Sequence, residues 1–400
     1  MNLREFVPRV MLVLWCLCGA ISPATGATWN IVSSPNPSTS GNELKAVAAI
    51  SATDAWAVGD YESSYGTLSL IEHWNGLAWK VVTSPNPGVP NQCGHGNVLN
   101  GVAARNTRDV WAVGYYYSCS LFKTLIEHWN GTKWSVVPSP SPNSQGYNVL
   151  YSVAAISAND VWAVGYAEKS NGAPMTLIEH WDGSSWSVVP SPNPSGSTNA
   201  SLLSVAAVSA TNIWAVGTYF NSSKGRNETL IEHSNGRTWT IVPSPSPSTA
   251  QWSRNILNSV SVVSATDIWA AGTTGYPTLI TLVEHWNGTK WSVVSSPNSS
   301  TAYGSFNVLN GITIVPGGKV WAVGYFGNAN TSYYQHRTLT LQWNGTSWSI
   351  VTSPSPGKAA NLSAVAPLST GKGVAVGLYS VYGNDYYGNM TAPATLVLSY

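Results

Sequence analysis

The chain has 400 residues and carries 18 basic and 17 acidic side chains, which gives a formal net charge of +1. A nearly neutral chain without a basic stripe is not expected to bind nucleic acid, because such binding depends on neutralising phosphates with Lys and Arg. After residue 27 there is no apolar run of about 18 residues, so we expect no membrane span in the mature chain.

The first 27 residues have the features of a secretory signal peptide. Arg4 and Arg9 give a basic start, residues 10–20 form a short apolar run, and small residues at 25–27 suit a cleavage site. We therefore expect cleavage near Ala27 and a secreted, extracellular protein. A retained N-terminal anchor is the alternative.

Residues 28–400 repeat one unit of about 50 residues. Each unit follows the pattern L-x-x-V-A-A-I-S-A-x-D-x-W-A-V-G, then a variable stretch, then T-L-I-E-H-W-N-G-x-x-W-S-V-V-x-S-P-x-P. The W-A-V-G motif recurs with its Trp at positions 56, 111, 162, 214, 269 and 321. A seventh unit begins at Leu362 and stops at Tyr400 before its last strand, and the missing strand stands at residues 29–37. Complementary ends of this kind indicate a closed ring rather than a linear stack.

Each unit contains four short runs with strand character: V-A-A-I, W-A-V-G, T-L-I-E-H-W and W-S-V-V. Asn-Gly or Asp-Gly between the last two runs is a strong hairpin signal. The sequence predicts an all-β fold, a seven-bladed β-propeller with four-stranded antiparallel blades. The last blade is closed by Trp29–Pro35, which joins strands from Leu362–Tyr400. Residues 28–400 form one domain, with predicted blades at 44–87, 99–142, 150–194, 202–247, 257–299, 309–356, and 362–400 plus 28–37.

Length variation among the units is confined to two sets of loops. The turns between the first and second strands and between the third and fourth strands keep a constant length, whereas the other connections vary. In a meander these variable loops emerge on one face, where binding usually resides. Cys93 and Cys119 lie in two of them, and in an exported protein we expect one disulfide that fixes both loops. Redox chemistry is the alternative.

Tryptophan marks the repeat, because all of the 20 Trp except Trp15 and Trp252 occupy repeated positions. Large side chains at regular positions are expected to fill the wedges between neighbouring blades. A sugar site lined by these Trp is the alternative. Packing gives no reason for Trp252, which precedes the fifth blade.

The dipeptide Glu-His recurs in the third strand of five units, beside the turn that carries Asp or Asn. We expect a hydrogen bond from this turn to the His, because buried polar groups need partners. The expected pairs are Asp54 with His73, Asp109 with His128, Asp160 with His180, and Asp267 with His285. In the last two units the Asp, Glu and His positions change together, to Lys, Leu, and Gln or Ser. We interpret the three groups as one structural network rather than as metal or acid–base sites, and we expect no metal and no cofactor.

No catalytic motif stands out, so no catalytic residue is assigned. The variable loops are instead rich in Tyr among small polar residues, a composition shared by recognition surfaces. The candidate ligand-binding residues are Tyr61, Tyr115, Tyr116, Tyr166, Tyr219, Trp252 and Tyr325. The alternative is that these Tyr only cap the ends of the blades.

The W-A-V-G … E-H-W-N-G-x-x-W unit of residues 28–400 resembles the repeats of secreted bacterial β-propeller proteins. This resemblance implies the propeller fold and an extracellular location. It implies no reaction and no catalytic residues.

The leading hypothesis is a secreted, monomeric, non-enzymatic binding or scaffold protein that recognises a glycan or a protein through aromatic loops on one face. One alternative is a carbohydrate-active enzyme of the glycosidase kind, with acids drawn from Asp60, Glu62, Glu168 or Glu228. The other is a structural component of the cell surface.

Overall fold

The computed structural model describes residues 28–88, 96–118, 121–328, 335–369, 371–381 and 392–400. The predicted signal peptide, Cys93 and Cys119 lie outside these ranges. All 28 elements within them are β-strands, so the predicted all-β class is confirmed.

The strands form five four-stranded sheets and one eight-stranded sheet, and within each four-stranded run the neighbours are antiparallel. The eight-stranded sheet contains β2 (Asn42–Ser51), β3 (Asp54–Ser63), β4 (Gly66–Trp74), β5 (Trp79–Val81), β6 (Gly96–Asn106), β7 (Asp109–Ser118), β8 (Leu121–Trp129) and β9 (Trp134–Val136). Its halves, β2–β5 and β6–β9, are joined where β4 and β6 pair in parallel at Thr67 and Gly96.

The next three sheets follow in chain order. They contain β10 (Asn148–Ser157), β11 (Asp160–Glu168), β12 (Pro174–Trp181) and β13 (Trp186–Val189); β14 (Ser197–Ser209), β15 (Asn212–Asn221), β16 (Arg226–Ser234) and β17 (Trp239–Ile241); and β18 (Arg254–Ser264), β19 (Asp267–Gly275), β20 (Ile280–Trp286) and β21 (Trp291–Val293).

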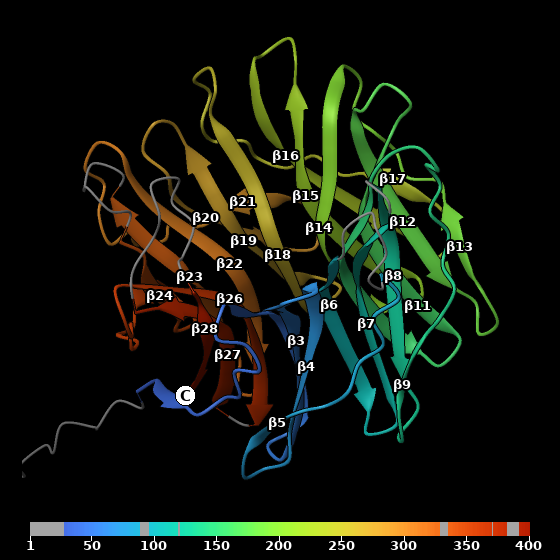
Figure 1. The fold of residues 1–400 in the computed structure, drawn as a ribbon. Helices are drawn as coiled ribbons and strands as arrows, with labels where there is room; N and C mark the ends of the chain where they lie inside the picture. Colours follow the sequence, from blue (N-terminus) through green and yellow to red (C-terminus); the bar gives the residue numbers. More distant parts are fainter. Residues whose placement is uncertain (1–27, 89–95, 119–120, 329–334, 370, 382–391) are drawn as a thin grey trace, which may run out of the picture.

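The last two sheets bring the chain back to its start. They contain β22 (Ser305–Val315), β23 (Lys319–Asn328), β24 (Arg337–Trp343) and β25 (Trp348–Ile350); and β26 (Ala359–Ser369), β27 (Lys372–Ser380) and β28 (Ala394–Ser399) with β1 (Asn30–Val32). The sheets stand radially around a central axis, and the chain passes once round the ring from blue to red (Figure 1).

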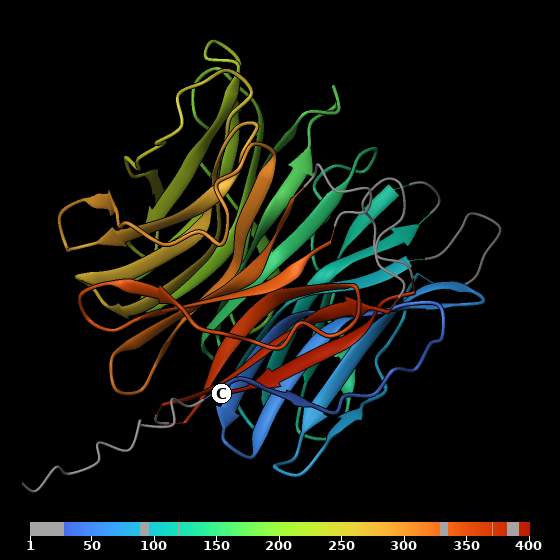
Figure 2. The same ribbon diagram turned by 90° about the vertical axis from the view of Figure 1, so that its left-hand side faces the viewer.

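The ring closes where the two ends of the chain pair. β1 runs antiparallel to β28, with Asn30 opposite Ser399 and Val32 opposite Val397. Trp29 is buried, and its ring centroid lies 5.1 Å from that of Trp321 in the neighbouring sheet. Both views show the blue N-terminal strand beside the red C-terminal strands (Figure 2). The pairing joins residues far apart in sequence, so the two ends stabilise each other.

The hydrophobic core lies between neighbouring sheets. In one such cluster Trp56 and Ile71 of the first four-stranded unit pack against Leu99, Val110 and Trp134 of the next unit. The repeated Trp side chains fill these wedges, and burial of each one contributes a few kcal/mol gross, at about 25 cal/mol per Å² of apolar surface.

A β-bulge in the first strand of every unit sets the geometry of the centre. In β2 the register shifts between Leu44 and Ala46, which leaves Lys45 as the extra residue. The glycine of W-A-V-G lies opposite, and a Cβ on Gly59 would meet the carbonyl oxygen of Glu43 at 1.9 Å. Glycine is therefore required for this close approach. The bulge residue turns toward the axis in all units: Lys45, Asn100, Tyr151, Leu203, Asn258, Asn310 and Ser363.

Candidate functional site

A cavity of about 400 Å³ occupies the axis of the ring and is lined by the first strand of every unit. Asn258 Nδ2 donates to the Leu309 carbonyl at 2.8 Å, and Asn310 Nδ2 donates to the Leu362 carbonyl at 2.8 Å. Each amide thus ties one unit to the next. Its nitrogen is used in this way, while its oxygen has no hydrogen-bond partner among the described residues.

A second cavity, of about 360 Å³, opens between the β18–β21 and β22–β25 sheets, and we call it the aromatic pocket. It shares Asn258 and Asn310 with the axial cavity. Its wall is formed by Arg254, Ile256 and Asn258 of β18, Thr273 of β19, Phe306, Val308 and Asn310 of β22, and Tyr325 of β23. Leu279, just before β20, and His336, just before β24, complete it.

Three rings form one side of the aromatic pocket. The Tyr325 and His336 rings are stacked, with centroids 4.8 Å apart and an interplanar angle of 23°. Phe306 meets both edge-on, 5.2 Å from His336 and 5.9 Å from Tyr325. The rings hold one another in a fixed arrangement, because aromatic pairs of these geometries attract beyond their buried area.

Burial favours the neutral forms of His336 and Tyr325 in the aromatic pocket. Burial lowers the pKa of His336, although a hydrogen bond from its Nδ1 to Asn361 Oδ1 at 2.9 Å opposes this shift. Burial also raises the pKa of the Tyr325 phenol, an effect that the nearby charge of Arg254 partly offsets. The pocket therefore presents neutral rings beside one permanent positive charge.

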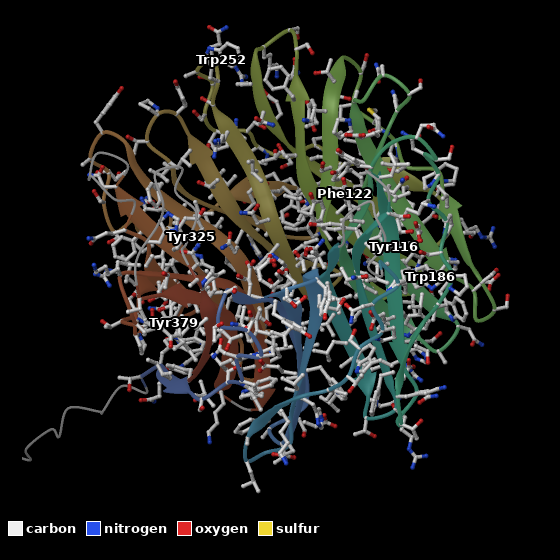
Figure 3. The ribbon with its side chains drawn as sticks, viewed as in Figure 1. Tyr116, Phe122, Trp186, Trp252, Tyr325 and Tyr379 are labelled. Atoms are coloured by element: carbon white, nitrogen blue, oxygen red, sulfur yellow. The ribbon has the colours of Figure 1, made fainter. Side chains whose placement is uncertain are left out.

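The seven predicted ligand-binding residues do not form one site. Three of them, Tyr116, Trp252 and Tyr325, lie well apart around the ring (Figure 3). Tyr325 lines the aromatic pocket. Tyr61, Tyr116 and Tyr219 instead pack against the hydrophobic clusters between sheets.

Tyr115 and Tyr166 belong to a separate aromatic group near the axis. Tyr115 lies 4.7 Å from Phe122, and Tyr166 lies 5.9 Å from the bulge residue Tyr151 (ring centroids). Burial raises the pKa of both phenols. These two side chains line neither the axial cavity nor the aromatic pocket, as far as the structure describes their walls.

Trp252 stands at the tip of a loop, 59% exposed, with a positive φ of 65°. Its backbone N–H donates to the Gly225 carbonyl at 2.8 Å, which ties the loop to the β15–β16 turn. Such a backbone conformation is costly for a residue with a side chain and needs support from its surroundings.

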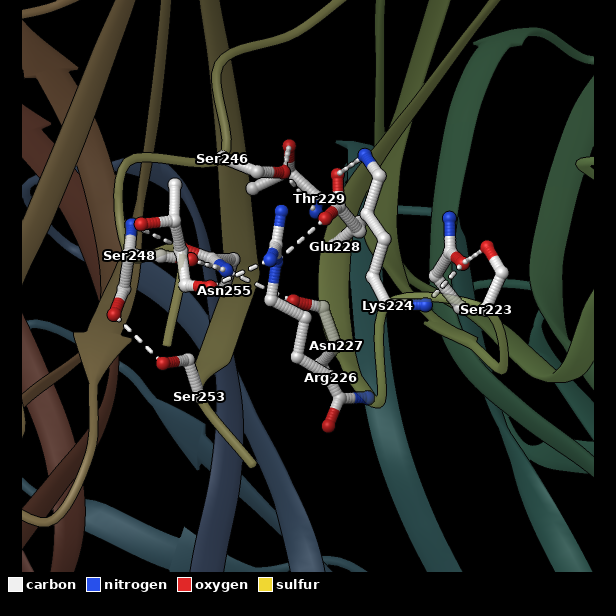
Figure 4. A network of polar contacts seen from close by, with 12 residues as sticks. Ser223, Lys224, Arg226, Asn227, Glu228, Thr229, Ser246, Ser248, Ser253 and Asn255 are labelled. Carbon is white, nitrogen blue, oxygen red and sulfur yellow. Dashed lines mark hydrogen bonds and ion pairs between the residues drawn. The ribbon is translucent and has the colours of Figure 1, made fainter. Parts of the chain in front are cut away.

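A polar network supplies that support (Figure 4). Arg226 Nε lies 2.8 Å from Glu228 Oε1, Lys224 Nζ lies 3.2 Å from Glu228 Oε2, and Arg226 also donates to the Thr249 carbonyl at 2.6 Å. Ser248 and Ser253 hydroxyls are 2.7 Å apart on either side of the loop tip. Trp252 is thus presented to solvent on a fixed loop, far round the ring from Tyr116.

The carboxylates considered for a glycosidase are engaged in separate places. Glu228 belongs to the ion-pair network, Glu168 accepts from the Tyr147 N–H at 3.0 Å, and Glu62 accepts from the Thr67 hydroxyl at 3.1 Å. Asp60 Oδ1 lies 3.3 Å from Lys45 Nζ. Burial raises the pKa of Asp60 to about 6, against the opposing charge of Lys45. None of the four lines the aromatic pocket in the described part of the chain.

Each of the four expected Asp–His pairs is hydrogen-bonded. The distance from His Nε2 to Asp Oδ1 is 2.8 Å for His73 and Asp54, 2.9 Å for His128 and Asp109, 2.9 Å for His180 and Asp160, and 2.8 Å for His285 and Asp267. In the remaining Glu-His unit Asn212 takes the place of Asp, 3.0 Å from His233.

The Trp of W-A-V-G completes this contact, a feature that the sequence reading missed. Trp162 Nε1 donates to the same Asp160 oxygen at 2.7 Å, and its ring centroid lies 4.1 Å from that of His180.

The prediction that the neighbouring Glu belongs to this network is wrong. Adjacent residues on a strand face opposite sides of the sheet, so the Glu points toward the preceding unit. Its partner there is the Ser of the S-P-x-P segment. The Ser Oγ to Glu Oε2 distances are 2.7 Å for Ser34 and Glu72, 2.8 Å for Ser84 and Glu127, 3.0 Å for Ser191 and Glu232, and 2.9 Å for Ser244 and Glu284.

Among the described residues no group of three or more His, Cys, Asp and Glu is placed to hold a metal ion. Nor does that part of the chain contain a helix with the length and apolar character needed to cross a membrane.

The radial four-stranded sheets and the central cavity define a β-propeller. No protein-family model matches the sequence, and no curated protein matches it. Solved structures do match the fold. A GH74 xyloglucanase from Xanthomonas campestris is 12% identical with a TM-score of 0.55, and the match covers 90% of this chain and 54% of the xyloglucanase.

Two further matches have lower TM-scores. The six-bladed fucose-binding lectin of Aleuria aurantia is 14% identical over 79% of this chain and 96% of the lectin, with a TM-score of 0.42. A Hadza microbial sialidase is 9% identical over 74% of this chain and 64% of the sialidase, with a TM-score of 0.45. At these identities the matches show a shared propeller fold alone.

Proposed function

We propose that this chain is a secreted seven-bladed β-propeller that binds a glycan in the aromatic pocket without turning it over. We count the eight-stranded sheet as two blades, because its halves meet only at the parallel pair Thr67 and Gly96 in the described part of the chain. Together with the five four-stranded sheets this gives seven blades. These blades follow the units drawn from the sequence within one domain, residues 28–400.

The observation that carries the proposal is the composition of the aromatic pocket. The Tyr325 and His336 rings offer a flat apolar surface, on which the C–H face of a sugar ring can lie. The amide oxygens of Asn258 and Asn310 and the guanidinium of Arg254 can bind hydroxyls and other polar substituents. A concave site of this size with few convergent polar groups is typical of ligand binding.

The arrangement of carboxylates favours binding over hydrolysis. Glycosidases place two carboxyl groups across the scissile bond, about 5–10 Å apart. The described wall of the aromatic pocket contains neither Asp nor Glu. The raised pKa of Asp60 would suit an acid, but Asp60 is held beside Lys45 in another unit.

Secretion, cleavage near Ala27, the Cys93–Cys119 disulfide and a monomeric state belong to the same proposal, with support from the sequence. Intact-mass measurement of the exported protein, before and after reduction, tests the first three. Sedimentation tests the fourth.

A glycan-array screen with the exported protein tests the function. We expect binding by the wild type, loss of about tenfold or more in Tyr325→Ala, and no change in Tyr65→Ala, where the ring is 66% exposed at another site. Equal binding by Tyr325→Ala would contradict the proposed site, provided that thermal unfolding shows both variants to be folded.

A further inference from the structure

We propose that the aromatic pocket selects glycans that carry a carboxylate, of the uronic acid or sialic acid class, and that Arg254 binds this carboxylate. This inference rests on the proposed glycan-binding function and adds the class of ligand.

Arg254 is the one charged side chain in the described wall of the aromatic pocket. In contrast to Arg226 and Arg105, which lie 2.8 Å from Glu228 and 2.6 Å from Asp109, it has no carboxylate partner among the described residues. Arg254 is exposed and lines a concave site, so an anionic ligand can reach it.

The position of Arg254 makes this pocket unlike the equivalent places in the ring. Arg254 stands three residues before Leu257, and Phe306 stands at the same position before Leu309, so equivalent positions of two neighbouring units both line the pocket. In the other five units this position holds Gly41, Gly96, Tyr147, Asn199 and Ala359. The combination of an Arg and an aromatic residue at this position therefore occurs at this one boundary, and a ligand that needs both would bind there.

The donor geometry of Arg favours a planar carboxylate. A guanidinium presents two parallel N–H groups that match the two oxygens of a carboxylate, and such charge-assisted pairs are stronger than neutral hydrogen bonds. The Tyr325–His336 stack lies beside it for the sugar ring, and the Asn258 and Asn310 amide oxygens can accept from sugar hydroxyls. The charge of Arg254 also influences the Tyr325 phenol, whose pKa it lowers against the larger effect of burial, so the charge reaches into the pocket.

The test compares each acidic glycan with a neutral counterpart. After the array screen, the exported protein is titrated by calorimetry with trigalacturonic acid and its methyl ester, and with 3′-sialyllactose, 3′-sulfolactose and lactose. The variants are Arg254→Gln, Arg254→Lys and, as a matched control on the opposite face, Arg237→Gln, whose side chain is exposed in the β16–β17 turn.

We expect the wild type to bind at least one carboxylated glycan about tenfold or more tighter than its neutral counterpart. Arg254→Gln should abolish this preference, Arg254→Lys should restore part of it, and Arg237→Gln should leave it unchanged. Added salt should weaken the preference, because the guanidinium is exposed.

Three results would overturn the inference. If the protein binds only neutral glycans and Tyr325→Ala loses this binding, the proposed glycan-binding function stands but the proposed preference for a carboxylate is wrong. Equal binding of the sulfated and carboxylated sugars would show recognition of charge without the planar group. Failure to bind any glycan on the array would instead overturn the proposed function itself.

Discussion

Ser191 Oγ lies 3.0 Å from Glu232 Oε2, across the boundary between two neighbouring blades. The contact joins the segment that follows β13, the last strand of one blade, to β16, the third strand of the next. The Glu232 side chain is fully buried, and burial raises its pKa to about 8, although the bond from Ser191 lowers it. The same contact recurs at three other boundaries, so it joins blades in much of the ring.

Stability should therefore fall as the pH rises. The pKa of Glu232 is raised above its unfolded value of 4.5 to about 8, so the folded state keeps a proton that the unfolded state releases between these pH values. Burial likewise raises the pKa of Glu72 to about 7, and of Glu127 and Glu284 to about 8. Stabilisation by these protons is present below pH 4.5 and is lost toward pH 8.

Glu232→Gln should flatten this pH dependence, because the amide does not ionise. Urea unfolding at pH 5, 7 and 8.5 measures the effect, which is at most about 1.4 kcal/mol per pH unit for one group. Glu62→Gln, at an exposed position, is the control. Parallel profiles for the wild type and Glu232→Gln would show that Glu232 is not protonated in the folded state.

Removal of the Ser191 hydroxyl should cost about 1–3 kcal/mol, since it leaves the buried Glu232 carboxyl group without its hydrogen-bond partner. Ser353→Ala is the matched control. Both hydroxyls donate to a Thr of their own blade, Ser191 to Thr176 at 2.7 Å and Ser353 to Thr338 at 2.9 Å, but the blade after Ser353 has Leu398 at the Glu position. Chemical unfolding should show the larger loss for Ser191→Ala. Equal losses of stability in Ser191→Ala and Ser353→Ala would show that the hydrogen bond to Thr, rather than the contact with Glu232, accounts for the effect.

The Asp160 carboxylate should matter as an acceptor rather than as a charge. It accepts from both His180 and Trp162, and Asn212 makes the same two contacts in the next blade. Asp160→Asn should therefore change the free energy of unfolding by less than about 0.5 kcal/mol, whereas Asp160→Ala should lower it by about 1–3 kcal/mol. A loss of similar size in both variants would point to a requirement for the charge.

Gly165 should tolerate no side chain. A Cβ there would lie 1.9 Å from the Val149 carbonyl oxygen, whereas a Cβ on Gly41 would meet its nearest neighbours at 3.4 Å. We expect Gly165→Ala to destabilise by about 3 kcal/mol or more, or to prevent folding, and Gly41→Ala to be mild. Thermal unfolding of the two variants makes the comparison, and a stable Gly165→Ala would mean that the bulge can rearrange.

Periodicity made the ring and its closure predictable, because Trp29 and Leu362 belong to complementary parts of one repeat. The Asp–His contact was also readable, since both groups change together in the last two units. The prediction for Glu232 was wrong because Glu and His are adjacent on one strand. Adjacent residues of a strand face opposite sides of the sheet, so the two side chains belong to different contacts.

The aromatic pocket could not be predicted in the same way, because Arg254, Phe306 and His336 stand at positions where the repeat has no constant residue. The bulge residues Asn258 and Asn310 line the same pocket. The glycine of W-A-V-G is a sequence signal for the bulge. Arg254 and Phe306 differ from the residues at the same position in the other units, and this difference could have indicated a special boundary between these two blades.

The location of a bound sugar in a crystal structure tests the central claim most directly. Crystals of the protein, grown with the glycan that binds best on the array, should show the sugar ring against Tyr325 and His336, between the β18–β21 and β22–β25 sheets. A sugar seated at Trp252 or elsewhere on the ring, with the aromatic pocket empty, would contradict it.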